Sequence, residues 1–170
     1  MAISRRLASA LVLLAALGAA VAAYALKGQN AAPATPAAPV VTFTTLESRQ
    51  IRLQDQQGKI VMVIFWATNC SICMGEMPDL IETYRQYQAR GFELIAVAMA
   101  YDDPEQVRKF ARSKGLPFPV VLDTSGSLAR SFNDTKVVPT IFLIDKKGNL
   151  VSRTLGAIDF SKLHQYLNRS

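Results

Sequence analysis

The sequence is poor in cysteine and histidine, with two cysteines and one histidine among its 170 residues. Two cysteines can form only one disulfide, which excludes a small domain held together by several disulfides. A structural zinc site needs four ligands, which two cysteines and the distant His164 cannot supply within one chain. Runs of basic residues are also missing: the formal net charge is +6, but the lysines and arginines are scattered among acidic residues. The sequence therefore gives no indication of a nucleic-acid-binding surface.

The longest uncharged stretch is 7–26, which is dominated by Leu, Ala and Val, with two arginines before it and a lysine after it. Its length is about that of a tilted helix that crosses a bilayer, and it exceeds the usual apolar core of a signal peptide. It also contains Ala23-Tyr24-Ala25, a pattern that a signal peptidase could cut. We interpret 1–26 as a signal anchor, with a cleaved signal peptide as the alternative. Both interpretations place the remaining chain where disulfides persist.

Composition divides the rest of the chain into a linker and one domain. Residues 27–39 are rich in Ala and Pro and offer nothing to bury, so we expect an extended linker. Residues 40–170 are long enough and apolar enough to build a single core.

Apolar runs alternate with segments of helical periodicity along this domain. The expected elements are a small hairpin within 40–53, strands at 60–65, 92–98, 119–122, 141–144 and 150–155, and helices at 71–90, 103–113, 127–132 and 159–168. We expect Pro78 to interrupt the first helix. This order predicts an α/β fold in which a mixed sheet has helices on both faces.

The two cysteines lie one helical turn apart, directly after the first apolar strand. Because the helix is expected to begin near Ser71, Cys70 should lie at its N-terminus. Unpaired amide groups and the helix dipole favour a thiolate there. The pattern Cys70-Ser71-Ile72-Cys73 therefore indicates a site for sulfur chemistry.

Several further motifs occur in a fixed order around this pair. They are Phe65-Trp66-Ala67 before Cys70, Glu76 and Pro78 after Cys73, Val138-Pro139-Thr140, and Phe142-Leu143-Ile144-Asp145 with Gly148. With these motifs, residues from about 40 to 168 resemble the TlpA/ResA type of thiol-disulfide oxidoreductase from the bacterial cell envelope. The resemblance implies a thioredoxin-like fold: a mixed central sheet flanked by helices, an N-terminal β-hairpin and a central β-α insertion at 92–122.

The resemblance also implies roles for the two cysteines. Cys70 attacks a substrate disulfide, and Cys73 resolves the mixed disulfide, so the two alternate between dithiol and redox disulfide. Their i, i+3 spacing suits this chemistry, because it brings the Cα atoms within the roughly 4.4 to 6.8 Å that a disulfide requires.

Four further residues take roles from the same resemblance. Glu76 would exchange a proton with Cys73, the alternative being a solvent-facing carboxylate favoured by the helix dipole. Pro139 would be a cis-proline facing the cysteines and would leave the backbone of Val138 free to pair with an extended substrate, the alternative being an ordinary trans proline. Trp66 would pack under the site and contribute to substrate binding, the alternative being a plain core aromatic residue.

The sequence departs from the family pattern beside the first cysteine. Many relatives have Trp immediately before it and Pro between the two cysteines, whereas this chain has Asn69 and Ser71-Ile72. Ile64 also replaces the buried strand carboxylate of cytoplasmic thioredoxin, which strengthens the case for Glu76. These departures affect substrate preference and reduction potential.

The implied function is reduction of protein disulfides on the periplasmic side of the inner membrane, in cytochrome c maturation or oxidase assembly. The implied partners are disulfide-containing clients, a DsbD/CcdA-type membrane thiol transporter as electron donor, and the membrane itself through the N-terminal helix. We expect a monomer that needs no cofactor and no metal.

Two other functions fit the residues less well. A Sco-like copper-binding module needs a wider cysteine spacing and a histidine that closes onto the metal, and His164 lies far away in the last helix. A peroxiredoxin-like peroxidase places a threonine three residues before its cysteine, whereas Thr68 lies two residues before Cys70.

Overall fold

A computed structural model describes residues 35–170 of the chain. The predicted anchor or signal peptide, 1–26, and most of the predicted linker, 27–39, lie outside the described residues. Within 35–170, no helix combines the length and the apolar character needed to cross a membrane.

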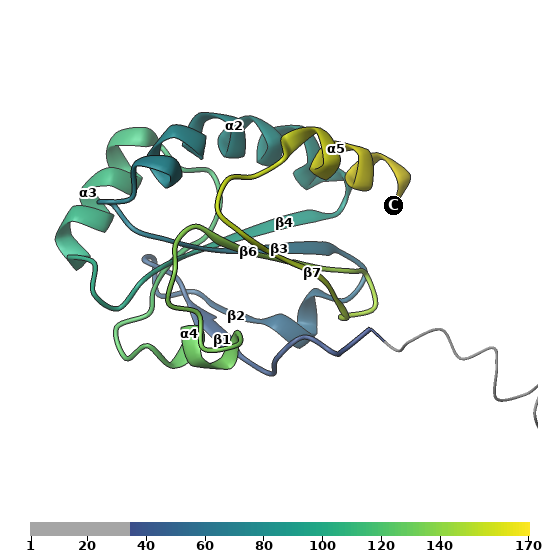
Figure 1. The fold of residues 1–170 in the computed structure, drawn as a ribbon, viewed down its shortest axis with the longest axis horizontal. Coiled ribbons are helices and arrows are strands. Elements are labelled where there is room, and N and C mark those ends of the chain that lie inside the picture. The colour runs from purple at the N-terminus through teal and green to yellow at the C-terminus, as the bar shows by residue number, and fades with distance from the viewer. Residues whose placement is uncertain (1–34) are drawn as a thin grey trace, which may run out of the picture. The chain divides into compact units, whose positions relative to one another are not determined.

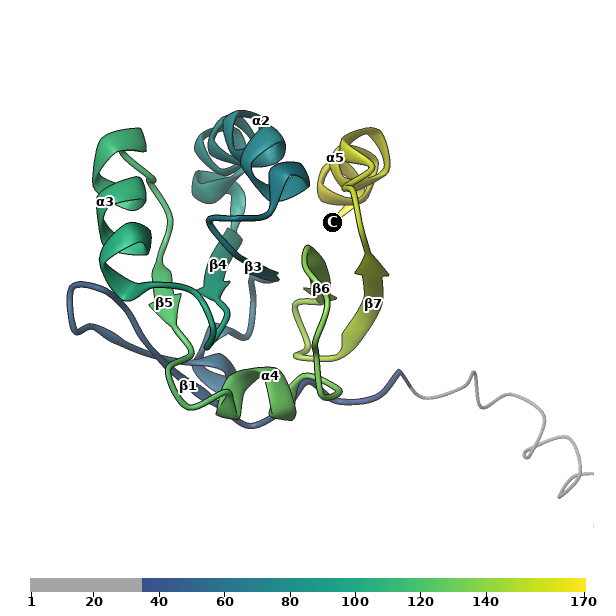
Figure 2. The same ribbon diagram turned by 60° about the vertical axis from the view of Figure 1, so that its left-hand side comes forward.

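Five strands form the central sheet in the order β5-β4-β3-β6-β7, which can be followed across Figure 2. Their bounds are β3 (Ile60–Trp66), β4 (Phe92–Ala98), β5 (Val120–Leu122), β6 (Thr140–Ile144) and β7 (Leu150–Leu155). Strands β3, β4 and β5 are parallel, β6 is antiparallel to β3, and β7 is antiparallel to β6. The mixed sheet predicted from the element order is confirmed.

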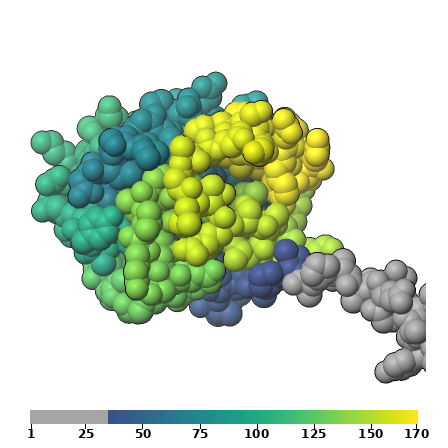
Figure 3. Space-filling model, viewed as in Figure 1, coloured from purple at the N-terminus to yellow at the C-terminus, as the bar shows by residue number. Residues whose placement is uncertain are grey.

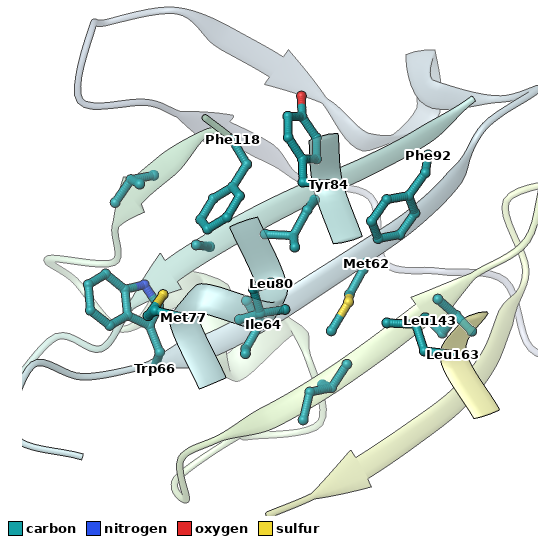
Figure 4. Close-up of a cluster of buried hydrophobic side chains, with 14 of the residues drawn as sticks. Met62, Ile64, Trp66, Met77, Leu80, Tyr84, Phe92, Phe118, Leu143 and Leu163 are labelled. Atoms are coloured by element: carbon teal, nitrogen blue, oxygen red, sulfur yellow. The ribbon is translucent and has the colours of Figure 1, made fainter. Parts of the chain in front are cut away.

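Strand β3 lies in the middle of the sheet and is buried along its whole length. Its side chains alternate between two core clusters, as the strand period of two requires. Met62, Ile64 and Trp66 belong to one cluster, and Val61, Val63 and Phe65 belong to the other. Figure 4 shows the first cluster, in which Leu80 and Met77 of a covering helix lie close to the side chains of β3. The uninterrupted apolar run in the sequence therefore reflects burial on both faces.

Three helices cover one face of the sheet, and a helix with a hairpin covers the other (Figure 1). The three helices are α2 (Ser71–Tyr87), α3 (Pro104–Lys114) and α5 (Phe160–Arg169). The opposite face carries α4 (Ser127–Ser131) and the predicted N-terminal hairpin of β1 (Thr42–Thr44) and β2 (Gln50–Arg52). Two short 3-10 helices, η1 (Leu53–Gln56) and η2 (Gln88–Arg90), complete the described elements.

Helix α2 runs without a break through Pro78, so the predicted interruption is wrong. Proline removes one backbone N–H from a helix, but this helix buries Met77, Leu80 and Tyr84 on either side of that position. The packing of its apolar face outweighs the single lost hydrogen bond. The helix continues into η2 and ends at Gly91, whose φ of 84° is the left-handed conformation that favours glycine.

The last residues of the predicted linker lie against the sheet. The N–H of Leu150, at the start of β7, donates to the carbonyl of Pro36 at 2.8 Å, and the N–H of Ala38 donates to the carbonyl of Gly148 at 2.9 Å. Ala37 thereby forms an isolated antiparallel bridge with Asn149.

Candidate active site

Four loops meet at one edge of the sheet. Because β3 and β4 are parallel, the segments that follow them, 67–70 and 99–103, leave from the same edge. Phe65 pairs with Thr140, and Thr140 pairs with Leu155, so the segments 137–139 and 156–159 lie at that edge too. The two cysteines lie within the first of these segments and the helix that follows it.

Cys70 is the N-cap residue of α2, as predicted. Its N–H donates to the carbonyl of Ala67 at 3.1 Å, which closes the turn after β3, and its carbonyl accepts from Met74 at 3.0 Å, which starts the helix. The Sγ atom of Cys70 accepts a hydrogen bond from the N–H of Cys73 at 3.2 Å. A thiolate at this atom would face the unpaired amides and the positive end of the helix dipole.

Cys70 and Cys73 form a disulfide, with their Cα atoms 5.3 Å apart. The pair is asymmetric: Cys73 is completely buried, whereas Cys70 is partly exposed. Another molecule can therefore reach the sulfur of Cys70, while Cys73 is shielded from solvent and lies within bonding distance of Cys70.

Glu76 lies one turn beyond Cys73 on α2, and its side chain is only partly exposed. Its Oε1 atom accepts a hydrogen bond from the N–H of Ile158 at 2.5 Å, whereas the buried Oε2 atom has no partner in the part of the chain that the structure describes. Burial raises the pKa of this carboxyl above its usual 4.5; the Ile158 hydrogen bond opposes the rise, and the charge of Asp79 adds to it. The carboxyl thus retains a proton at higher pH than an ordinary glutamate.

The peptide bond between Val138 and Pro139 is cis, as predicted. The carbonyl of Pro139 accepts from the N–H of Gly156 at 2.9 Å, and the hydroxyl of Thr140 donates to the carbonyl of Val137 at 2.6 Å. Between them, the N–H and carbonyl of Val138 have no hydrogen-bond partner among residues 35–170. The backbone of Val138 is therefore free to pair with another chain.

The loop from β7 to α5 joins the two halves of the site. Its Gly156 N–H holds Pro139, and its Ile158 N–H holds Glu76. The side chain of Ile158 also lines an apolar groove of about 410 Å³ between β7 and α5, on the face shown in Figure 3. One loop thus fixes both the helix and the proline segment, a connection between residues 82 positions apart that the sequence does not reveal.

Trp66 lies at the end of β3 and is fully buried. Its indole packs against Phe110 of α3, with ring centroids 5.5 Å apart, and its Nε1 atom has no hydrogen-bond partner among the described residues. The side chain cannot touch a bound substrate in this arrangement. Any part that it has in substrate binding is through support of the loop that begins at Ala67.

His164 is remote from the cysteines. Its Nε2 atom lies 2.9 Å from the hydroxyl of Thr83, and its ring lies near Tyr87 and Phe160. Thr83 follows Cys70 by thirteen positions on α2, or roughly 20 Å at 1.5 Å per residue. The histidine that a Sco-like copper site needs is therefore out of reach of the two cysteines.

Asp102 belongs to the site, although the motifs did not reveal it. Its carboxylate accepts hydrogen bonds from both the N–H and the hydroxyl of Thr68, two residues before Cys70. A signal was present in the sequence: two acidic residues, Asp102 and Asp103, follow the strand β4 that is parallel to β3, and the carboxyl ends of neighbouring parallel strands share an edge.

Known proteins resemble this chain over most of its length. The model of the AhpC/TSA family matches residues 34–153. The chain is 32 % identical to the thiol-disulfide oxidoreductase ResA of Bacillus subtilis, over 93 % of this chain and 87 % of that protein. It is 36 % identical to the thiol-disulfide oxidoreductase ResA of Geobacillus thermodenitrificans, over 92 % of this chain and 89 % of that protein.

A solved structure gives the same result for the fold. The thiol:disulfide interchange protein of the thioredoxin family from Chlorobium tepidum superimposes with a TM-score of 0.74 at 25 % identity, covering 82 % of this chain and 98 % of that one. The predicted thioredoxin-like fold is confirmed. Each match covers most of the chain, so the likeness is one of a whole domain and not of a two-cysteine motif alone.

Proposed function

Because the chain belongs to the AhpC/TSA family and to its ResA-like thiol-disulfide oxidoreductases, we propose that it reduces disulfide bonds in client proteins. The observation that carries the proposal is the Cys70–Cys73 disulfide at the N-terminus of α2, in which Cys70 alone is accessible. The direction of the reaction, reduction, follows from the kinship with the ResA type.

The reaction begins with both cysteines reduced. The Cys70 thiolate attacks one sulfur of the client disulfide, and the other client sulfur leaves as a thiolate that takes up a proton. Cys73, as a thiolate, then attacks the sulfur of Cys70, which releases the second client sulfur and forms the Cys70–Cys73 disulfide. Two electrons and two protons pass from this protein to the client.

Glu76 is the proposed proton partner of Cys73. The Cys73 thiol must lose its proton before it attacks, and it is buried away from water. Glu76 lies one turn further along the same helix, with the unpartnered Oε2 atom available to receive a proton. The raised pKa of this carboxyl brings its affinity for a proton closer to that of a thiolate, which favours transfer between them.

Val138 and Pro139 form the proposed substrate-binding half of the site. The free N–H and carbonyl of Val138 can pair with an extended client segment, as a strand adds to an open edge. Two large apolar side chains stand exposed beside the reacting groups: Val137 at 60 % and Ile72, between the cysteines, at 48 %. We therefore expect clients whose disulfide cysteine is flanked by apolar residues.

The proposed partners and location rest on the family resemblance and on the N-terminal sequence. The proposed clients act in cytochrome c maturation or oxidase assembly, and a DsbD/CcdA-type membrane thiol transporter returns the protein to its reduced form. The protein acts as a monomer on the periplasmic side of the inner membrane, anchored by 7–26 or released after cleavage of the signal peptide.

The mechanism is tested by trapping the mixed disulfide. Cys73→Ser retains the nucleophile but lacks the resolving thiol, so it should accumulate disulfide-linked adducts with a model disulfide protein, visible on non-reducing gels. Cys70→Ser serves as its matched control, since it should form no adducts and should reduce clients at less than about 1 % of the wild-type rate. Unchanged activity in Cys70→Ser would refute the mechanism.

A further inference from the structure

The carboxylate of Asp102 accepts two hydrogen bonds from one residue, Thr68, in the loop that carries Cys70. One oxygen accepts from the N–H of Thr68 at 2.7 Å, and the other accepts from its hydroxyl at 2.6 Å and from the N–H of Asp103 at 3.0 Å. None of the ion pairs found in the described part of the chain includes Asp102. Among the described residues, this carboxylate is therefore held by hydrogen-bond donors and not by an ion pair.

Asp102 does not serve as the cap of the neighbouring helix. That task belongs to Asp103, whose side chain accepts from the N–H groups of Glu105 and Gln106 at the start of α3. The two adjacent carboxylates thus bind different segments: Asp103 binds the first turn of α3, and Asp102 binds the loop between β3 and α2.

The hydrogen bonds between Thr68 and Asp102 lie in the middle of the loop between β3 and α2, and other hydrogen bonds fix both ends of this loop. The carbonyl of Trp66 accepts from Met99 at 3.0 Å, and Cys70 is bound to Ala67 and to the first turn of α2. When the disulfide is reduced, its covalent bond no longer holds Cys70 beside Cys73. The hydrogen bonds from Thr68 to Asp102 then remain to hold the backbone of the loop that carries the free sulfur.

We propose that Asp102 is a positioning residue for the nucleophile: through Thr68 it keeps the reduced Cys70 sulfur at the N-terminus of α2, while its charge limits how far the thiolate is stabilised. The proposal rests on the proposed attack by Cys70. The two effects have opposite signs, because the helix N-terminus favours the thiolate and a nearby carboxylate disfavours it.

The other ionisable groups around this loop are few. Tyr101 adjoins Asp102, and burial together with the charge of Asp102 raises the pKa of its phenol, so this group is neutral at physiological pH. Asp103 caps α3, and the carboxyl of Glu76 accepts from the N–H of Ile158 in the loop between β7 and α5. Asp102 is thus the carboxylate tied most directly to the Cys70 loop.

The test is the pH dependence of alkylation of Cys70 by iodoacetamide, in which the thiolate displaces iodide. All variants carry Cys73→Ser, so that Cys70 is the single reactive thiol. Asp102→Asn keeps an acceptor for the Thr68 N–H but removes the charge, and should lower the Cys70 pKa by a few tenths of a unit to about one unit. Thr68→Val keeps the charge of Asp102 but removes the hydrogen bond from the Thr68 hydroxyl, and should raise the Cys70 pKa.

Two controls separate this role from a structural one. Asp103→Asn removes an equal charge one residue away and should leave the Cys70 pKa within about 0.2 unit of the parent, and Thr68→Ser, which keeps the hydroxyl, should do the same. Shifts of the same sign in Asp102→Asn and Thr68→Val, or no shift in either, would overturn the proposal. If Asp102→Asn does not fold, the comparison of Thr68→Val with Thr68→Ser decides alone, and equal pKa values refute the proposal.

Alkylation requires no client, so this result is independent of the proposed function. Client reduction that persists in Cys70→Ser would refute the proposed function, whatever the alkylation experiment shows.

Discussion

At the scale of single residues, the chemistry of the site depends on unequal surroundings for similar groups. Cys70 is partly exposed at the helix N-terminus, whereas Cys73 is fully buried one turn later. Among the carboxylates of α2, Glu76 is the one bound to another element, through the N–H of Ile158. Burial, more than spacing along the sequence, thus distinguishes the groups to which the proposed mechanism gives attack, resolution and proton transfer.

Glu76 should make the stability of the protein depend on pH. Burial raises the pKa of its carboxyl above 4.5 in the folded protein, so the native state binds this proton more tightly than the unfolded chain does. The stabilisation that this bound proton gives to the folded state is therefore fully present below pH 4.5, and it is lost as the pH rises through the raised pKa of Glu76. Urea denaturation of the oxidised protein from pH 4 to 8 should show the wild type losing stability relative to Glu76→Gln as the pH increases.

Glu82→Gln provides the matched control, because Glu82 is an exposed carboxylate on the same helix. Its unfolding free energy should follow the wild type across the whole pH range. Parallel curves for the wild type and Glu76→Gln would contradict the burial argument.

At the scale of elements, most helices and strands were predicted with ends within about one residue of those observed. The expected helix at 103–113 agrees with α3 to within one residue at each end, because Asp103 caps the helix, Pro104 suits its first turn and Gly115 suits its end. The apolar run of β3 was equally clear. The continuity of α2 through Pro78 was not predicted, because it depends on packing against the sheet, which the local sequence pattern does not contain.

The cap of α3 should contribute measurably to stability. Asp103 accepts from two N–H groups of the first turn, so Asp103→Ala should lower the free energy of unfolding by about 1 kcal/mol. Urea denaturation measures this change. Glu105→Ala, an exposed acidic residue of the same first turn, should cost only a few tenths of a kcal/mol. Equal losses in the two variants would show that the cap contributes nothing specific.

At the scale of the whole molecule, the sheet brings distant segments to one edge. Asp102 reaches Thr68 across 34 positions, and Ile158 reaches Glu76 across 82. Local patterns predicted the position of Cys70 at the start of a helix and the element order, and the family resemblance predicted the cis-proline. The sequence did not predict Asp102 or the β7–α5 loop, since those contacts depend on strand order and register.

The direction of electron flow depends on the reduction potential of the Cys70–Cys73 pair, which has to be measured directly. Asn69, Ser71 and Ile72 replace the residues that many relatives carry around the cysteines, and these positions adjoin the thiolate. Reduction of client disulfides is the proposed direction, and residues next to a thiolate affect the reduction potential.

The measurement that tests the central claim most directly is the equilibrium reduction potential of the Cys70–Cys73 pair, determined against glutathione or a reference dithiol. A protein that reduces client disulfides should have a potential closer to that of thioredoxin, about −270 mV, than to that of the oxidant DsbA, about −120 mV. A value near −120 mV would contradict the proposed reductase and identify an oxidant instead.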